Sequence, residues 1–277
     1  MSIGRVSGKS RIRMGPLHHE RLYPDAQVVR VRFVILGEIL EFCIEYVPGM
    51  AGLADLADGL YWLCDQTTEI VIRSIESRGG TIACRKGCAL CCRHLIPVSV
   101  AEAASLGRYL LEDRHANGSC IERFRAAAGR VSREFEKFKG QVDIEGMDFS
   151  QLSDGLNAWY EQAGIDCPML VDESCCVYES RPMICRQWGV VGNSQQCMNG
   201  AMVAVRKIAQ PISYSDILRQ VGVRLGLFGN ETVLLPFALD WYQANRPKCD
   251  RQVKTERLVT EFLNVLDRKT QGAIKIL

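Results

Sequence analysis

The sequence lacks the long apolar segments that membrane-spanning and exported proteins carry. It contains no stretch of about 18 uncharged apolar residues, and this absence excludes a transmembrane helix. Basic residues follow the N-terminus, from Arg5 to Arg13, but no apolar segment comes after them, so no secretory signal peptide is recognisable. We therefore expect a cytoplasmic protein without a membrane partner, in a compartment where thiols stay reduced.

A strong net charge, sequence repeats and low-complexity segments are also missing. The formal net charge is +2 over 277 residues, so the chain carries no strong field that would attract nucleic acid or an anionic surface. A nucleic-acid-binding zinc module would need a basic, aromatic face near its ligands, and near-neutrality disfavours it. With 47% apolar and 24% charged residues, the composition is that of an ordinary globular protein.

Alternating apolar residues predict a β-hairpin over residues 27–46. Gly37-Glu38 suits a two-residue turn with glycine in first place. The resulting register places Arg30 opposite Glu45 and pairs like side chains: Ile35 with Leu40, Phe33 with Phe42, Val31 with Ile44 and Val29 with Tyr46. We interpret the hairpin as scaffold; the alternative is an open strand edge that binds a partner.

Most of the remaining pattern is helical. Apolar residues recur at helical spacing over 52–78, and Gly79-Gly80 ends this helix. Ser99 and Glu102 form a capping box at the start of a helix that reaches Glu112. Similar patterns predict further helices over residues 119–139, 151–164, 213–227, 236–245 and 252–268. The predicted fold class is therefore α+β and mainly helical, with an N-terminal β-hairpin and an irregular cysteine-rich metal module packed among helices.

Four regions follow from these patterns. Residues 1–26 lack periodicity and are expected to form a flexible tail. Residues 27–80 hold the hairpin and the first helix. The other two regions are a cysteine-cluster module at 81–200, with a helical insertion at 99–164, and a C-terminal helical region at 201–277.

The most informative feature is the distribution of thirteen cysteines, nine of which fall into two groups. The first group consists of Cys84, Cys88, Cys91 and Cys92. The second group consists of Cys167, Cys175, Cys176, Cys185 and Cys197. In a reducing compartment such groups indicate metal ligands or redox groups, and the two adjacent pairs suit disulfides poorly because a bond between sequence neighbours is strained. A secreted, disulfide-bonded protein is the alternative.

The spacing within the first group suits chelation of a metal. Cys88 and Cys91 are two residues apart, so one turn can present both sulfurs to one ion. If a short helix starts at Arg85, Cys84 and Cys92 lie on the same face as Cys88. Thiolates are soft, anionic ligands that bind zinc and iron–sulfur clusters. Nearby basic residues would offset the thiolate charge: Arg85, Lys86, Arg93, His94, Arg181 and Arg186.

Three other cysteines are interpreted without a metal. Cys64 falls inside a predicted helix and is expected in the core as a small hydrophobic residue. Cys120 is interpreted as incidental, and Cys249 as a solitary exposed thiol. Asp172 and Glu173 lie among the second group and could act as acid or base, but we interpret them as turn residues.

Over residues 84–197 the chain resembles a known family, the bacterial cysteine-cluster proteins with the CxxCxxCC signature, which are described as zinc- or iron-chelating. The family's first element, C-x(2,3)-C-x-x-C-C, is matched by Cys84 to Cys92. Its second element is C-P-x-L, then C-x-[IV]-Y-x-x-R-P-x-x-C-R-x-[aromatic], then a later cysteine. This element is matched by Cys167-Pro168-Met169-Leu170, by the segment from Cys175 to Trp188, and by Cys197.

The resemblance implies a metal centre with eight cysteine ligands: Cys84, Cys88, Cys91, Cys92, Cys167, Cys175, Cys185 and Cys197. Cys176 occupies the family's variable position and stays outside this set. The metal would be zinc or iron, the iron either alone or in an iron–sulfur cluster. The function we expect is metal binding.

An enzymatic role is the alternative and is left open. One branch of the family contains flagellin lysine-N-methylases, which suggests a metal- or cluster-dependent methyltransferase. No glycine-rich strand–turn–helix site for a methyl donor supports this independently. The spacing of Cys84, Cys88 and Cys91 also equals the radical-SAM signature. A fourth cysteine follows at once, however, and the chain lacks the alternating strands and helices that a barrel requires.

Overall fold

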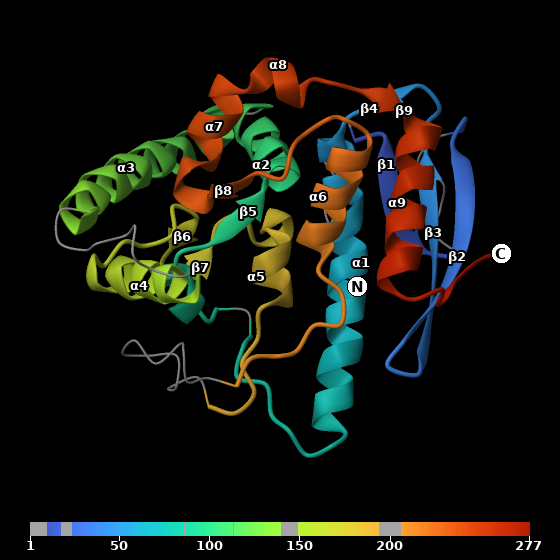
Figure 1. Cartoon of the computed structure of the whole chain (residues 1–277), viewed down its shortest axis with the longest axis horizontal. Coiled ribbons are helices and arrows are strands. Elements are labelled where there is room, and N and C mark those ends of the chain that lie inside the picture. Colours follow the sequence, from blue (N-terminus) through green and yellow to red (C-terminus); the bar gives the residue numbers. More distant parts are fainter. Residues whose placement is uncertain (1–9, 18–23, 86, 113, 140–148, 194–205) are drawn as a thin grey trace.

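An antiparallel hairpin and one long helix organise the fold of the computed structural model, which describes residues 10–17, 24–85, 87–112, 114–139, 149–193 and 206–277 (Figure 1). Helices dominate and the strands pair in small antiparallel sheets, so the predicted mainly helical α+β class is confirmed. The largest sheet has the order β1-β3-β2-β10. Its strands are β1 (Ile12–Pro16), β2 (Gln27–Ile35), β3 (Glu38–Tyr46) and β10 (Ile274–Ile276).

The hairpin of β2 and β3 is present, but its predicted register is wrong. Each β2 residue pairs two positions earlier in β3, so that Val31 faces Phe42 and Phe33 faces Leu40. The turn residues are Leu36 and Gly37, and both have positive φ (+50° and +83°), as a type I′ turn requires. A shift of two residues leaves every side chain on its predicted face, because side chains alternate with a period of two.

Two strands that sequence patterns did not predict cover part of the edges of this hairpin. β1 pairs with β3, and β10, close to the C-terminus, pairs with β2. The predicted tail at 1–26 is therefore wrong for residues 12–16, where Ile12 and Met14 are buried. Five residues that include glycine and proline give little periodic signal and have a low intrinsic strand propensity. Their strand conformation is stabilised by pairing with the longer strand β3. β1 covers β3 only from Phe42 to Tyr46 and β10 covers β2 only from Val31 to Phe33, so the partner-binding alternative stays a prediction.

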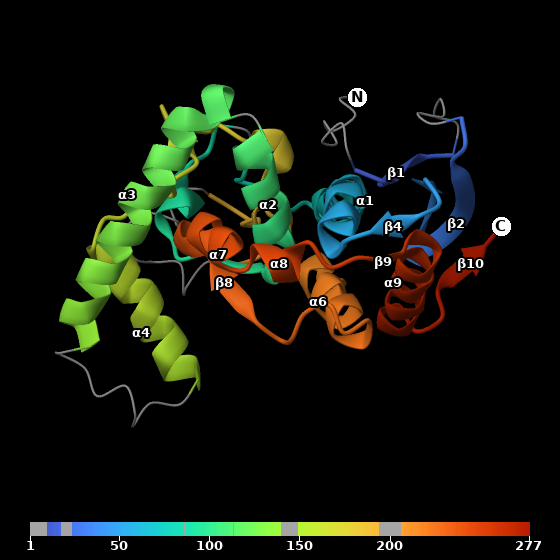
Figure 2. The ribbon, with the colours of Figure 1, turned by 90° about the horizontal axis from the view of Figure 1, so that it is seen from above.

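Helix α1 (Leu53–Glu76) lies between the sheet and most of the other helices (Figure 2). It confirms the helix predicted at 52–78. α1 and α9 (Thr255–Lys269) lie on the same side of the sheet, and α6 (Tyr214–Arg224) contacts both of them. One hydrophobic core joins these elements, and the C-terminal region shares it with the hairpin and α1.

The predicted capping box at the start of α2 (Val100–Glu112) is confirmed. The Ser99 hydroxyl accepts from the Glu102 amide at 3.3 Å, and the Ser99 amide donates to the Glu102 carboxylate at 3.1 Å. α2 packs against α1, α3, α6 and α7. The buried residues of α2 thereby extend the hydrophobic core from the side of the sheet towards the cysteine-rich segments.

The other helices lie close to their predicted positions. They are α3 (Arg114–Lys139), α4 (Phe149–Gln162) and α7 (Ala238–Ala244), which follows the 3₁₀ turn η5 (Leu235–Phe237). The short helix α8 (Arg246–Cys249) was not predicted. Cys249, predicted to be exposed, is half-buried at the end of α8. Two minor antiparallel sheets pair β4 (Met50–Ala51) with β9 (Val253–Lys254), and β5 (Pro97–Ser99) with β8 (Thr232–Leu234). None of the helices described is both long and apolar enough to cross a membrane.

Candidate metal centre

Seven of the eight predicted ligands line one cavity of about 380 Å³. These residues are Cys84, Cys88, Cys91, Cys92, Cys167, Cys175 and Cys185. The eighth, Cys197, lies outside the described residues. Segments that are distant in sequence therefore present their thiols to the same space, as the two-group interpretation predicted.

The local structure of the first group differs from the prediction. No helix starts at Arg85: Cys84 and Cys88 lie in a loop, where the Cys88 amide donates to the Arg85 carbonyl at 2.9 Å. Gly87 has φ +89°, which interrupts right-handed helical backbone at this point. Cys91 and Cys92 lie on the short 3₁₀ turn η1 (Leu90–Arg93).

The second group combines a turn, a small hairpin and a short helix. Cys167 and Pro168 lie in a turn, closed by a 2.9 Å hydrogen bond from the Leu170 amide to the Cys167 carbonyl. Cys175 ends β7 (Ser174–Cys175), which pairs with β6 (Leu170–Val171), and Cys185 lies on α5 (Met183–Gln187).

The link between β6 and β7 confirms the prediction for Asp172 and Glu173. Both residues have positive φ (+47° and +56°), as the central residues of a tight hairpin turn require. Glu173 also pairs with Arg93, across 2.6 Å.

Backbone pairing holds the loop of the first group against the chain that follows Cys185. The Ala83 amide donates to the Val190 carbonyl at 2.9 Å, and the Gly192 amide donates to Thr81 at 2.8 Å. These bonds fix one wall of the cavity without any contribution from the thiols.

The long helix α1 supplies a wall that sequence reasoning missed. Asp65, Thr68, Glu69 and Ile72 line the cavity from one face of α1. Their spacing of three, four and seven residues is the helical repeat, so they form a mixed polar stripe beside the apolar stripe of the same helix. That stripe was visible in the sequence, but nothing in it indicated that the cysteines would pack against it.

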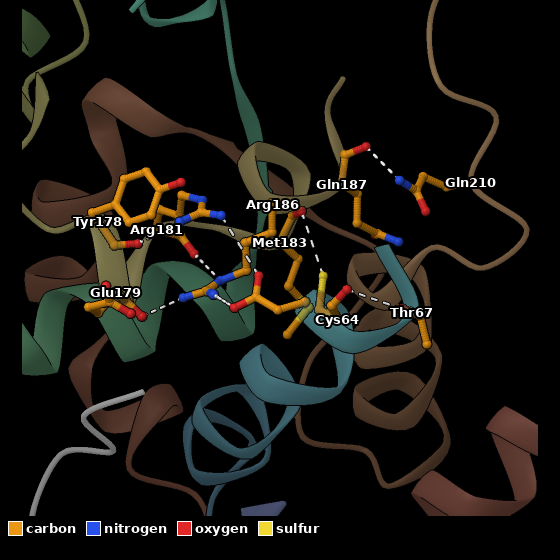
Figure 3. A network of polar contacts seen from close by, with 10 residues as sticks. Cys64, Thr67, Tyr178, Glu179, Arg181, Met183, Arg186, Gln187 and Gln210 are labelled. Carbon is orange, nitrogen blue, oxygen red and sulfur yellow. Dashed lines mark hydrogen bonds and ion pairs between the residues drawn. The ribbon is translucent and has the colours of Figure 1, made fainter. Parts of the chain in front are cut away.

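A buried arginine connects α1 to the segment that carries Cys185 (Figure 3). The Arg186 guanidinium bonds to the Asp65 carboxylate and to the carbonyl of Glu179, and its Nε donates to the Arg181 carbonyl at 2.9 Å. It also lies 4.5 Å from the ring centroid of Tyr61. Only 5% of Arg186 is exposed, so the guanidinium is a fixed positive charge in the cavity wall.

The other cations predicted around the cysteines divide into two sets. Arg85 and Arg181 line the cavity together with Arg186, whereas Arg93 pairs with Glu173, and His94 Nδ1 lies 2.7 Å from Glu161. Lys86 lies outside the described residues. Three acidic side chains also line the cavity, Asp65, Glu69 and Glu179. The cavity wall thus presents similar numbers of positive and negative side chains around the thiols.

Hydrogen bonding and burial raise the pKa values of five of these thiols, which favours their protonated form in the absence of a metal. A hydrogen bond to Cys92 and burial raise the pKa of Cys91. A hydrogen bond to Cys167 raises the pKa of Cys92 to about 12. Burial raises the pKa values of Cys84, Cys175 and Cys185 as well. Neighbouring cysteines act in the same direction, because a nearby thiolate disfavours a second negative charge.

The donor set fits a thiophilic metal in its chemistry, but its arrangement does not form a coordination sphere. Within the described part of the chain, no three His, Cys, Asp or Glu side chains are placed so that they could hold a metal ion. No disulfide joins any of the twelve described cysteines. A metal bound here would have to draw sulfurs together from different sides of the cavity.

Five of the described cysteines lie outside the lining of this cavity: Cys43, Cys64, Cys120, Cys176 and Cys249. Cys64 is fully buried in the core, as predicted, with its sulfur 4.0 Å from the Met183 carbonyl (Figure 3). Cys120 and Cys176, which the interpretation of the sequence left without a role, meet each other with their sulfurs 3.7 Å apart. A hydrogen bond from Cys120 lowers the pKa of Cys176 to about 6, and the hydrogen bond and positive charge of Arg123 add to this effect. Burial acts in the opposite direction.

Comparisons with known proteins found no family model, no curated protein and no solved structure that matches this chain. The family resemblance drawn from the cysteine motifs therefore stays a prediction. The fold and cavity define a mainly helical α+β protein with a thiol-lined cavity, and its function has to be argued from that cavity.

Proposed function

We propose that this protein binds zinc or iron, the iron either as an ion or in an iron–sulfur centre, through about eight cysteine thiolates. The observation that carries the proposal is the convergence of seven predicted ligands, from two separate groups, on one cavity. Cys197 would be the eighth ligand. We place this activity in the cytoplasm, where the thiols stay reduced.

The chemistry of the donors supports this assignment. Sulfur ligands select soft and borderline metals, and an all-cysteine set suits zinc or iron–sulfur chemistry rather than magnesium or calcium. Several thiolates around one or two metals leave net negative charge. Arg85, Arg181 and Arg186 line the same cavity and would offset part of that charge.

Metal binding would change the thiols in two ways. Each ligating sulfur has to lose a proton, and burial makes that loss unfavourable in the absence of a metal. The sulfurs also have to approach one another, because the described side chains form no ready coordination sphere. Binding should therefore release protons and stabilise the segments that carry the cysteines.

The first experiment measures metal, acid-labile sulfide and the absorption spectrum of protein purified without oxygen. Colourless protein with zinc and no sulfide would support a zinc site. Brown protein with iron and sulfide would support a cluster. Protein without stoichiometric metal under these conditions, even after reconstitution with either metal, would contradict the proposal.

A matched pair of variants connects any metal to the cavity. Cys92→Ser removes a sulfur from the cavity lining, whereas Cys249→Ser removes a half-buried sulfur that is not in that lining. Serine is a poor ligand for these metals. We expect Cys92→Ser to lower the metal content and Cys249→Ser to leave it unchanged.

A second pair of variants separates a structural metal from one with a further role. Cys84→Ser and Cys185→Ser alter opposite groups of the cavity lining. If both variants unfold, the metal stabilises the fold; if both fold and lose the metal, the site serves another purpose.

The methyltransferase alternative gains no specific support, because every strand pair in the described residues is antiparallel. Both a doubly wound methyl-donor domain and a radical-SAM barrel need parallel strands.

A further inference from the structure

Cys120 and Cys176 form a close thiol pair outside the cavity that seven other cysteines line. Cys120 lies on α3 and is 4% exposed, whereas Cys176 follows β7 directly and is exposed to solvent. Their sulfurs are 3.7 Å apart, which is van der Waals contact. Neither residue lines the thiol-lined cavity.

Independent contacts hold this pair in place. The Arg123 side chain, less than one turn after Cys120, donates to the Cys176 sulfur at 3.5 Å and to the Pro168 carbonyl at 3.0 Å. The Cys176 amide donates to the Met169 carbonyl at 2.8 Å. The backbone of Cys176 and the guanidinium beside its sulfur are therefore both anchored to the segment that begins at Cys167.

The geometry is close to what a disulfide needs. A disulfide has an S–S bond of about 2.05 Å, so the sulfurs would have to approach by roughly 1.6 Å from their 3.7 Å separation. The difference in exposure also assigns an order of events. An oxidant in solvent reaches the exposed Cys176 first, because Cys120 is buried.

We propose that Cys120 and Cys176 are a redox-active dithiol that a hydroperoxide converts into a disulfide. The Cys176 sulfur, after giving its proton to solvent, attacks the peroxide oxygen; an S–O bond forms, the O–O bond breaks and water or an alcohol leaves. The Cys120 sulfur then attacks the Cys176 sulfenic acid, the S–S bond forms, and the hydroxide leaves as water with the Cys120 proton. The two thiols lose two electrons and the peroxide gains them.

The disulfide would link α3 to the strand that carries Cys175. Cys175 lines the thiol-lined cavity and Cys176 is its neighbour in sequence. Oxidation would therefore restrain one side of that cavity. Formation of this disulfide needs no metal, so its test is independent of the test for metal binding.

The test maps disulfides after the folded protein has been treated with hydrogen peroxide. Digestion after glutamate yields residues 113–122, which contain Cys120 alone, and residues 174–179, which contain Cys175 and Cys176. We expect these peptides to be recovered joined, with the loss of two hydrogen atoms, from chelator-treated and untreated protein alike. If Cys120 stays fully available for alkylation after denaturation, the proposal is wrong.

Three variants identify the partners. Cys175→Ser should retain the joined peptides, and Cys176→Ser should lose them. Cys120→Ser should leave a sulfenic acid at Cys176 that dimedone traps, because the resolving thiol is gone. If the joined peptides persisted in Cys176→Ser and vanished in Cys175→Ser, the bond would belong to Cys175, and the proposal would be overturned.

Discussion

The amide of Cys167 donates a hydrogen bond to the carbonyl of Cys92 at 2.7 Å, and this bond joins the two cysteine groups through the backbone. The Ala83–Val190 bond joins them a second time at the other end. Because these contacts use main-chain atoms, they do not involve the thiols directly. The cavity is therefore a property of the fold, and a metal would contract it rather than create it.

Replacing Arg186 with methionine should destabilise the protein. The substitution removes the hydrogen bonds to the Asp65 carboxylate and to the Glu179 and Arg181 carbonyls, and it leaves Asp65 half-buried with fewer positive charges nearby. Breaking a buried ion pair from one side typically costs about 3 kcal/mol. Arg186→Lys should recover only part of this loss, because an ammonium cannot reproduce the planar fork.

Urea denaturation at neutral pH measures this loss. Arg246→Met is the control: the Arg246 side chain is 63% exposed, and its contact with Asp250 is 3.9 Å long. The control should change the free energy of unfolding by less than about 0.5 kcal/mol. Equal effects for the two variants would show that Arg186 does not fix the cavity wall.

Glu102 connects three helices through a single buried carboxylate. It accepts hydrogen bonds from the Ser99 amide and hydroxyl, from the Ser215 hydroxyl at 2.8 Å, and from the Met183 amide at 2.7 Å. Met183 begins α5, the helix of Cys185. Glu102→Ala should therefore lower the free energy of unfolding by about 3 kcal/mol or more, since buried donors lose their acceptor.

Two further variants test this role of Glu102. Glu102→Gln keeps the size of the side chain but turns one acceptor into a donor, so its loss should be intermediate. Glu122→Ala replaces an exposed glutamate on α3 and should be close to neutral. A Glu102→Ala variant as stable as Glu122→Ala would contradict the role of the carboxylate as a connection between helices.

The sequence predicted the elements of the fold better than their pairing. Helix periodicity and the Ser99–Glu102 capping box act within one segment, so they could be recognised without knowledge of neighbours. The hairpin register depended on whether Leu36 takes positive φ, which is uncommon for leucine. β1 and β10 gain their strand conformation from β3 and β2, and no local signal marks them.

The candidate site shows the same division. Spacing and motif selected seven cysteines that share one cavity, because both are visible within short segments of the chain. The predicted helix at Arg85 was wrong because Gly87 takes a conformation that spacing does not reveal. The meeting of Cys120 with Cys176 and the α1 wall with Asp65 result from tertiary packing. Single-sequence patterns carry no information about such contacts.

Asp58 should make stability depend on pH. It is buried beside Asp55, and it accepts hydrogen bonds from Ser105 and from Arg108. Burial raises the pKa of Asp58 to about 6, and Arg108 and Ser105 only partly oppose this. Between about pH 4 and about pH 6 the folded state therefore keeps a proton that the unfolded chain loses. The contribution of Asp58 to stability is present at low pH and is lost as the pH rises through about 6.

Asp58→Asn should remove this dependence. The unfolding free energy of the wild type minus that of the variant should fall by up to about 3 kcal/mol from pH 4 to pH 6. Above pH 6 this difference should stay constant. Chemical denaturation at several pH values measures it. Asp240→Asn, at an exposed position, should give parallel curves. A difference that rises with pH would show that the folded state prefers the ionised carboxylate.

Two glycines in helices should respond to alanine with opposite signs. A Cβ at Gly107 in α2 would lie 2.3 Å from Cγ of Tyr242 in α7, where the two helices pack together. A Cβ at Gly118 in α3 would have no neighbour within 4 Å. Gly107→Ala should cost roughly 1–3 kcal/mol because Tyr242 has to move. Gly118→Ala should stabilise the protein by about 0.5–1 kcal/mol through helix propensity.

For a chain of this size the melting temperature should shift by roughly 2–4 °C per kcal/mol, downward for Gly107→Ala and upward for Gly118→Ala. If Gly107→Ala also raised the melting temperature, the close contact between α2 and α7 would be wrong.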